Sequence, residues 1–318
     1  MNAQQFRQLL IDATNQQTAT PIIPPGFIEP TAYFKKPAAT FGTLNLATSE
    51  LQVLFDKQGR LVDSKGNTIV APIATPGGER FTLEAGILQM SRTAAAGAHV
   101  VVRPDPDKAQ AIGPADPMLA IERQIKYFNT VEAAPFAAVT DDADVSASVL
   151  PVHRSTINWS ASGQKAVRFE VKRRDLKAIG NDVFVDEVLL SLVLGLARQA
   201  DAVLLAAIKA ATPAAFTLAA AAAQGLRIDD LRALVGTNGN GATWRGDGVF
   251  TAANIPADLT ADTDITVAGA FNRAGVAIHE DVTVTAERRN LQGDLIVTAY
   301  ANMIPLLPDA AKFWTVGA

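Results

Sequence analysis

The 318-residue sequence contains no cysteine. Disulfide bonds, thiolate nucleophiles, cysteine-bound zinc and iron–sulfur clusters are therefore all excluded. Because disulfides form in oxidising compartments, a chain without cysteine is typical of a protein that folds in a reducing environment. We expect such an environment, similar to the cytoplasm, for this chain.

Long apolar runs and an excess of charge of one sign are also absent. The most apolar run, Val188–Ala197, covers about half of the length that a membrane-spanning helix needs. The first residues of the chain do not show the pattern of a secretory signal. The formal net charge is −4, so no strong attraction to nucleic acid or to an anionic membrane is expected. We therefore expect a substantial core and no membrane partner.

Catalytic motifs are missing as well. The three histidines, His99, His153 and His279, are far apart, so a helical metal-binding pair is excluded. The glycine-rich stretch Gly236–Gly248 lacks the Gly-Lys-Ser/Thr of a phosphate-binding loop, and we interpret it as a surface loop. The acidic clusters do not continue into a calcium-binding loop. We expect no cofactor, no metal and no catalytic residue; the enzyme alternative is a hydrolase with paired carboxylates.

Proline, in contrast, is frequent near the beginning of the chain. Five prolines lie between Pro21 and Pro37, so this segment is neither a helix nor a central strand. Before it, residues 1–16 show the apolar spacing of one amphipathic helix. We predict an extended arm whose apolar side chains are buried either on the chain's own body or on a neighbouring subunit. The candidate contact residues of this arm are Ile22, Ile23, Phe27, Tyr33 and Phe34.

The next part of the chain alternates short apolar runs with turn signals. Residues 51–103 are therefore predicted to be rich in β-strands. Four prolines between Arg103 and Pro117 indicate a loop. A helix is expected to follow, capped by Asp116. Its apolar face would comprise Met118, Ile121, Ile125 and Phe128.

Polar and apolar residues alternate most clearly between residues 139 and 172. Lys165–Arg174 has apolar residues on one side and charged residues on the other. A turn at Ser160–Gln164 separates it from another alternating stretch, Val152–Trp159. Together they predict a long two-stranded hairpin. An isolated hairpin is only marginally stable in water, so this one must pack on the chain itself or on a neighbour.

Positive charge concentrates on the predicted hairpin and just after it. Binding of nucleic acid is one interpretation. Aromatic residues are sparse among the basic ones and the net charge is negative, so we favour a rim that faces solvent or the acidic residues of a neighbouring subunit. The candidate contact residues here are Arg154, Trp159, Lys165, Arg168, Arg173 and Arg174.

Helical periodicity is strongest from Asp182 to about Lys209, where apolar residues recur every three or four positions. This pattern predicts a long and largely buried helix. Leu226–Val235 is predicted to form a further short helix. Alternation near the end of the chain predicts a pair of antiparallel strands joined by a turn at Asn290–Asp294.

The order of these elements resembles the major capsid protein of tailed phages, the Hong Kong 97-type fold. Three stretches carry the resemblance. Ala147–Leu176 is similar to the extended loop of that family, Asn181–Ile208 to the helix that follows it, and Asp281–Trp314 to the closing strands of its peripheral domain. The resemblance covers roughly the last 180 residues and depends on spacing and apolarity, not on a rigid motif.

The resemblance implies an α+β fold with an N-terminal arm, an extended β-hairpin loop, a long helix, and peripheral and axial domains. We divide the chain accordingly into five segments. They are an extended arm (1–50), a β-rich segment interpreted as an insertion (51–115), a helix with the extended loop and the start of the long helix (116–180), the long helix with a short axial domain (181–260), and the closing strands of the peripheral domain (261–318).

The function that the resemblance implies is that of the major capsid protein of a tailed double-stranded DNA phage, which assembles through pentamers and hexamers into an icosahedral shell. The implied partners are further copies of the chain, a portal protein, a scaffolding protein and a decoration protein, with packaged DNA contacted weakly and non-specifically. The implied location is the virion, after assembly in the host cytoplasm. Two other structural functions stay open: the shell of an encapsulin-type nanocompartment, and a phage tail or baseplate protein.

Overall fold

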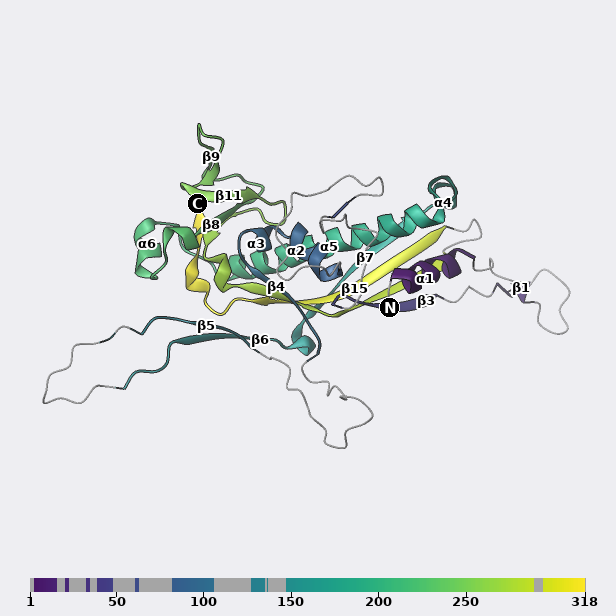
Figure 1. The fold of residues 1–318 in the computed structure, drawn as a ribbon, viewed down its shortest axis with the longest axis horizontal. Helices are drawn as coiled ribbons and strands as arrows, with labels where there is room; N and C mark the ends of the chain where they lie inside the picture. The colour runs from purple at the N-terminus through teal and green to yellow at the C-terminus, as the bar shows by residue number, and fades with distance from the viewer. Residues whose placement is uncertain are drawn as a thin grey trace, which may run out of the picture.

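The computed structural model of the chain is a mixed α+β protein with one long helix and two large sheets (Figure 1). The α+β class predicted from the sequence is confirmed. The structure describes residues 3–15, 21–22, 33–34, 39–47, 61–62, 82–105, 127–134, 136, 147–288 and 294–317.

The main sheet is organised by β15 (Leu295–Leu306), which is paired along both of its edges. On one edge it pairs with β7 (Gly163–Val171) over nine residues. On the other edge it pairs first with β14 (Asp281–Arg288) and then with β13 (Gly275–His279). The predicted closing pair of antiparallel strands is therefore confirmed as β14 and β15.

β13 and β14 lie end to end along β15, with a register shift of two residues between them. Their outer neighbour changes at the same place: β4 (His99–Arg103) pairs with β13, and β3 (Thr40–Asn45) pairs with β14. Glu280 joins the two halves, since its N–H donates to the carbonyl of Arg103 at 3.0 Å and its carbonyl accepts from the N–H of Leu46 at 2.8 Å. Extra residues bend a strand locally and interrupt its ladder, but here both backbone groups of Glu280 are hydrogen-bonded.

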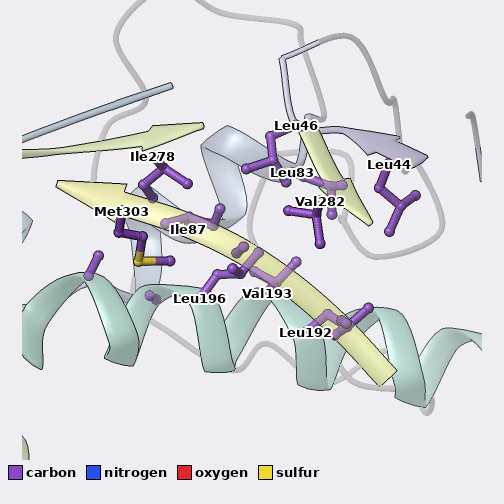
Figure 2. Close-up of a cluster of buried hydrophobic side chains, with 14 of the residues drawn as sticks. Leu44, Leu46, Leu83, Ile87, Leu192, Val193, Leu196, Ile278, Val282 and Met303 are labelled. Carbon is purple, nitrogen blue, oxygen red and sulfur yellow. The ribbon is translucent and has the colours of Figure 1, made fainter. Parts of the chain in front are cut away.

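The long helix α5 (Asn181–Ala210) packs along one face of the main sheet. In Figure 2, Leu192, Val193 and Leu196 of α5 lie toward the strand that carries Met303. The helix predicted from Asp182 to Lys209 is confirmed. Four described helices pack against α5 with their own apolar residues. They are α1 (Ala3–Asn15), α2 (Leu83–Met90), α3 (Arg92–Ala95) and α4 (Arg173–Ile179).

The second sheet lies beyond the C-terminal end of α5 (Figure 1). Its strand order is β16-β12-β8-β11-β10-β9, with β11 parallel to β8 and the other pairs antiparallel. A separate apolar cluster, which includes Trp314 and Ile255, forms its core. The elements of this region are α6 (Leu218–Ala223), β8 (Arg232–Val235), β9 (Ala242–Trp244), β10 (Phe250–Ala252), β11 (Ile255–Leu259), β12 (Thr266–Gly269) and β16 (Phe313–Val316).

Two short ladders remain. β1 (Pro21–Ile22) pairs with β2 (Tyr33–Phe34), and β5 (Tyr127–Val131) pairs with β6 (Val152–Thr156). The second sheet thus takes strands from residues 232–269 and 313–316, and the main sheet takes strands from residues 40–45 as well as from the C-terminal region. These groupings cross the segment boundaries drawn from the sequence.

Three sequence-based predictions of local structure are wrong. Within the segment predicted to be β-rich, residues 83–90 and 92–95 are helical, because Thr82 and Ser91 cap α2 and α3 (Arg92–Ala95) by accepting from backbone N–H groups. Leu226–Val235 ends in the strand β8, not in a helix, because its apolar residues pair between two other strands. Phe128, assigned to a helix, lies in β5; the rest of that helix falls outside the described residues.

The predicted long hairpin is also corrected. Its two halves do form strands, β6 and β7, but they do not pair with each other. β6 pairs with β5, and β7 pairs with β15. Alternation identifies a strand and its two faces, but the partner of a strand is chosen by contacts distant in sequence.

Of the described helices, α5 is long and apolar enough to span a membrane, with a hydropathy of 1.8 in Val183–Ala210, and 50% of that window is buried. Its apolar residues pack against the main sheet and the neighbouring helices. The apolar character of α5 is explained by its position in the core.

The N-terminal helix α1 belongs to the body of the protein. Phe6 and Leu10 are fully buried in the main core, next to β3 and β14. The amphipathic helix predicted over residues 1–16 is confirmed as α1. Residues 3–15 and 40–45 are not extended away from the body as an arm, however, because α1 packs in the core and β3 adds a strand to the main sheet.

We expect Phe6→Ala to lower the free energy of unfolding by about 3–5 kcal/mol, because it leaves a cavity in a packed core. Gln8→Ala, on the exposed side of the same helix, is the control and should cost less than about 0.5 kcal/mol. Urea unfolding followed by circular dichroism measures both. Equal effects would show that α1 does not pack as described.

One buried carboxylate joins α5 to the start of α3. Asp201 of α5 is fully buried, and it accepts hydrogen bonds from Ser91 Oγ and Thr93 Oγ1, both at 2.6 Å. It also accepts from the backbone N–H groups of Arg92 at 2.8 Å and Thr93 at 3.0 Å. Burial raises the pKa of Asp201, while the hydrogen bonds from Ser91 and Thr93 oppose that rise.

Asp201→Ala leaves these buried donors without an acceptor, so we expect a loss of about 3–5 kcal/mol in the free energy of unfolding. Asp175→Ala removes an exposed carboxylate that pairs with Arg174, and it should cost less than about 1 kcal/mol. Chemical denaturation of the two variants tests this difference. A cost for Asp201→Ala no larger than that of the control would contradict the assignment.

Candidate functional site

Among the described residues, no group of three or more His, Asp or Glu side chains could hold a metal ion. The three histidines lie on different strands: His99 packs against Phe128, His279 packs edge-on to Trp159, and His153 is exposed on β6. The candidate site is a surface with exposed apolar side chains.

That surface is the ribbon, which we define as β5, β6 and the described residues that continue them, 132–134, 136 and 147–151. Figure 1 shows it extending from beneath the main sheet to beyond the body. Three of its apolar side chains are strongly exposed: Phe136 at 106%, Val149 at 91% and Leu150 at 71%. Val131 and Tyr127 are exposed as well.

The root of the ribbon is packed firmly on the body. Ile157, directly after β6, is buried against Ala277 and Leu306 of the main sheet. Phe128 and Trp159 pack against the same cluster. The indole N–H of Trp159 donates to the carbonyl of Pro104 at 3.1 Å. The ribbon is thus fixed at one end, and its apolar side chains project away from that end.

Charged residues hold the root in place. Glu132, just after β5, pairs with Arg273 through one carboxylate oxygen and with Lys312 through the other, at 3.3 Å. The side chain of Lys312 is only 4% exposed, and its Nζ also donates to the carbonyl of Gln224 at 2.8 Å. Because Arg273 and Lys312 lie where the two sheets meet, Glu132 ties the ribbon to that junction.

The candidate contact residues predicted from the sequence are placed as follows. Arg154 is exposed on the ribbon, and Lys165, Arg168, Arg173 and Arg174 are exposed on β7 and α4. Trp159 packs on its own chain, so its main contacts are internal. The structure pairs the backbones of Ile22, Tyr33 and Phe34 within β1 and β2, and Ile23 and Phe27 lie outside the described residues.

Other residues of the site were missed by sequence reasoning. Glu132 is 141 residues from Arg273 and 180 from Lys312, so no local pattern could have paired them. Phe136, Val149 and Leu150 follow neither helical nor strand periodicity. One sequence feature could have drawn attention to them: they lie in residues 133–150, a stretch that contains acidic but no basic residues.

No protein-family model matches the sequence, and no curated protein matches it. Several solved structures match the fold. The capsid of a native GTA particle matches with a TM-score of 0.41 and 12% identity, over 80% of this chain and 97% of that chain. A virus-like particle from Pyrococcus furiosus matches with a TM-score of 0.41 and 10% identity, over 74% and 97% of the two chains.

The satellite phage P4 procapsid, in a structure that includes the size determination (Sid) protein, matches with a TM-score of 0.41 and 11% identity, over 73% and 96% of the two chains. Structures of phage capsids are thus among those similar to this chain. The family that the sequence resembles is also one of phage capsid proteins. Similarity at this level gives no individual residue a role.

We expect Glu132→Gln to loosen the root of the ribbon, because it removes the charge that pairs with Arg273 and the buried Lys312. Hydrogen exchange measured by mass spectrometry should then be faster in residues 127–131 and 152–156. Glu187→Gln, an exposed change on α5, is the control and should leave the exchange of both strands unchanged. Unchanged exchange in the Glu132 variant would show that packing alone holds the ribbon.

Proposed function

We propose that the chain is the subunit of a protein shell, specifically the major capsid protein of a tailed double-stranded DNA phage. In this proposal it assembles with copies of itself, through pentamers and hexamers, into a closed icosahedral container for the genome. It has no catalytic activity and no cofactor. A portal protein, a scaffolding protein and a decoration protein are the further partners, and the virion is the location.

The observation that supports this proposal is the ribbon. A single chain leaves Phe136, Val149 and Leu150 exposed at the far part of a two-stranded element whose root is fixed by packing and ion pairs. Burying each of these side chains is worth about 1.5–3 kcal/mol before the costs of association. An apolar element that extends beyond the body is stabilised when another copy covers it.

The order of elements supports a capsid subunit over other self-associating proteins. The ribbon, β7, the long helix α5 and the closing strands β14 and β15 follow one another as they do in the Hong Kong 97-type family that the sequence resembles. The small net charge of −4 also suits the inner wall of a container that binds DNA weakly. In this assignment the main sheet with α5 corresponds to the peripheral domain and the second sheet to the axial domain.

Purified full-length chain should therefore form closed particles in negative-stain electron micrographs. The combined variant Phe136→Ser, Val149→Ser and Leu150→Ser should keep the circular dichroism and melting temperature of the parent protein but remain in small species by light scattering. Its matched control carries Leu218→Ser, Ile228→Ser and Val249→Ser, three exposed apolar residues outside the ribbon, and should still assemble.

The outcomes separate the proposal from its alternatives. Rings or tubes in place of closed shells would indicate a tail or baseplate protein. Closed shells that carry protein cargo and no DNA when isolated from their natural source would indicate a nanocompartment. A parent protein that stays monomeric at high concentration would overturn the shell function altogether.

A further inference from the structure

The glycine-rich connection between β8 and β9 contains two Asn-Gly dipeptides, Asn238-Gly239 and Asn240-Gly241, and all four residues are exposed. Asparagine loses its side-chain amide most readily when glycine follows it, because glycine has no side chain to hinder attack by its own backbone nitrogen. Asparagine is for this reason among the thermolabile residues of proteins. The structure holds the two dipeptides in different ways.

Both reacting groups of the first dipeptide are held by hydrogen bonds. The backbone N–H of Gly239 donates to the carbonyl of Gly236 at 3.0 Å. The side-chain Oδ1 of Asn238 accepts from the N–H of Asn240 at 3.2 Å. The backbone of Asn238 is fixed as well, because its N–H donates to the carbonyl of Asp264 at 3.1 Å. Attack by the nitrogen of Gly239 on the side chain of Asn238 therefore requires two hydrogen bonds to break.

The second dipeptide lacks this protection. In the part of the chain that the structure describes, neither the N–H of Gly241 nor the side-chain amide of Asn240 has a hydrogen-bond partner. Gly241 has a φ of 71°, and a Cβ atom at this position would clash with the side chain of Val316. The fold therefore requires glycine at the position that makes Asn240 reactive.

We propose that Asn240 is a site of spontaneous deamidation and that Asn238 is protected from it. The backbone nitrogen of Gly241 loses its proton and attacks Cγ of Asn240. The new C–N bond closes a succinimide ring, and the bond between Cγ and the side-chain nitrogen breaks as ammonia leaves. Water then opens the ring at either carbonyl carbon and gives aspartate or isoaspartate. Water is the co-reactant, and nothing is oxidised or reduced.

The modification changes an exposed edge of the second sheet. Each event adds one negative charge to a chain whose formal net charge is −4. In the isoaspartate product the main chain also gains one carbon atom directly before Gly241, whose carbonyl accepts from the N–H of Ala253 at 3.2 Å. This bond lies beside the pair of β9 and β10 at the edge of the sheet. The inference goes beyond the proposed shell function and does not depend on it.

The first test compares the two asparagines within one molecule. Purified full-length protein is kept in mildly alkaline buffer at physiological temperature, sampled over weeks and digested with trypsin. Cleavage after Arg232 and Arg245 leaves both asparagines in one peptide, residues 233–245, and tandem mass spectrometry measures the replacement of NH₂ by OH at each. We expect Asn240 in the folded protein to react about tenfold faster than Asn238 or more. In a synthetic peptide of the same residues, the two should react at similar rates.

The second test removes the reactive side chain. Glutamine forms the corresponding ring far more slowly, so Asn240→Gln should abolish the acidic species that ageing produces in ion-exchange chromatography. The melting temperature should be unchanged, because Asn240 is exposed. The control is Asn238→Asp, which keeps the oxygen that accepts from the N–H of Asn240 and should still deamidate at Asn240 at the rate of the parent protein.

Three results would overturn the inference. The first is a folded protein in which Asn238 reacts as fast as Asn240 or faster. The second is an Asn240 that stays intact in the folded protein while the synthetic peptide reacts. The third is an Asn240→Gln variant that accumulates the acidic species as the parent does. Because each measurement is made on the purified chain in any state of association, none of these results bears on the shell function.

Discussion

The pairing of β15 along both edges is the interaction on which the rest of the structure depends. β7 on one edge and β13 with β14 on the other give this strand backbone partners along most of its length. Its alternate side chains then face either α5 or the root of the ribbon, so a single strand forms the floor of two different surfaces. The long helix and the root of the ribbon both take their positions from that strand.

The separation of these two surfaces has a direct consequence for association. The root of the ribbon packs on the face of the main sheet opposite α5, and the ion pairs of Glu132 with Arg273 and Lys312 hold it there. Phe136, Val149 and Leu150 therefore stay exposed in a single chain. In the shell that we propose, a second copy covers them.

Comparison with the sequence shows which patterns are reliable. The periodicity of α5 predicted its type and its ends to within a residue or two, because 30 residues repeat one pattern and the helix is closed by local hydrogen bonds. Alternation likewise identified β7, β14 and β15. The partner of β6 was predicted wrongly, since neighbouring strands in sequence need not pair. Residues 83–90 and 92–95 were predicted as strands and became helices, because caps from Thr82 and Ser91 outweighed a weak β pattern.

By itself the sequence determined the composition of the core, the position of the long helix, the closing strands and the presence of more apolar material than a thin extended segment can bury alone. These properties are local or compositional, and so they can be read from neighbouring residues. Only the tertiary structure decided that α1 belongs to the body, that Asp201 joins α5 to α3, and that α5 and the root of the ribbon lie on opposite faces of one sheet. Each of these depends on contacts between residues more than 100 positions apart, whose pairing is set by burial and hydrogen bonding in three dimensions and leaves no pattern along the chain.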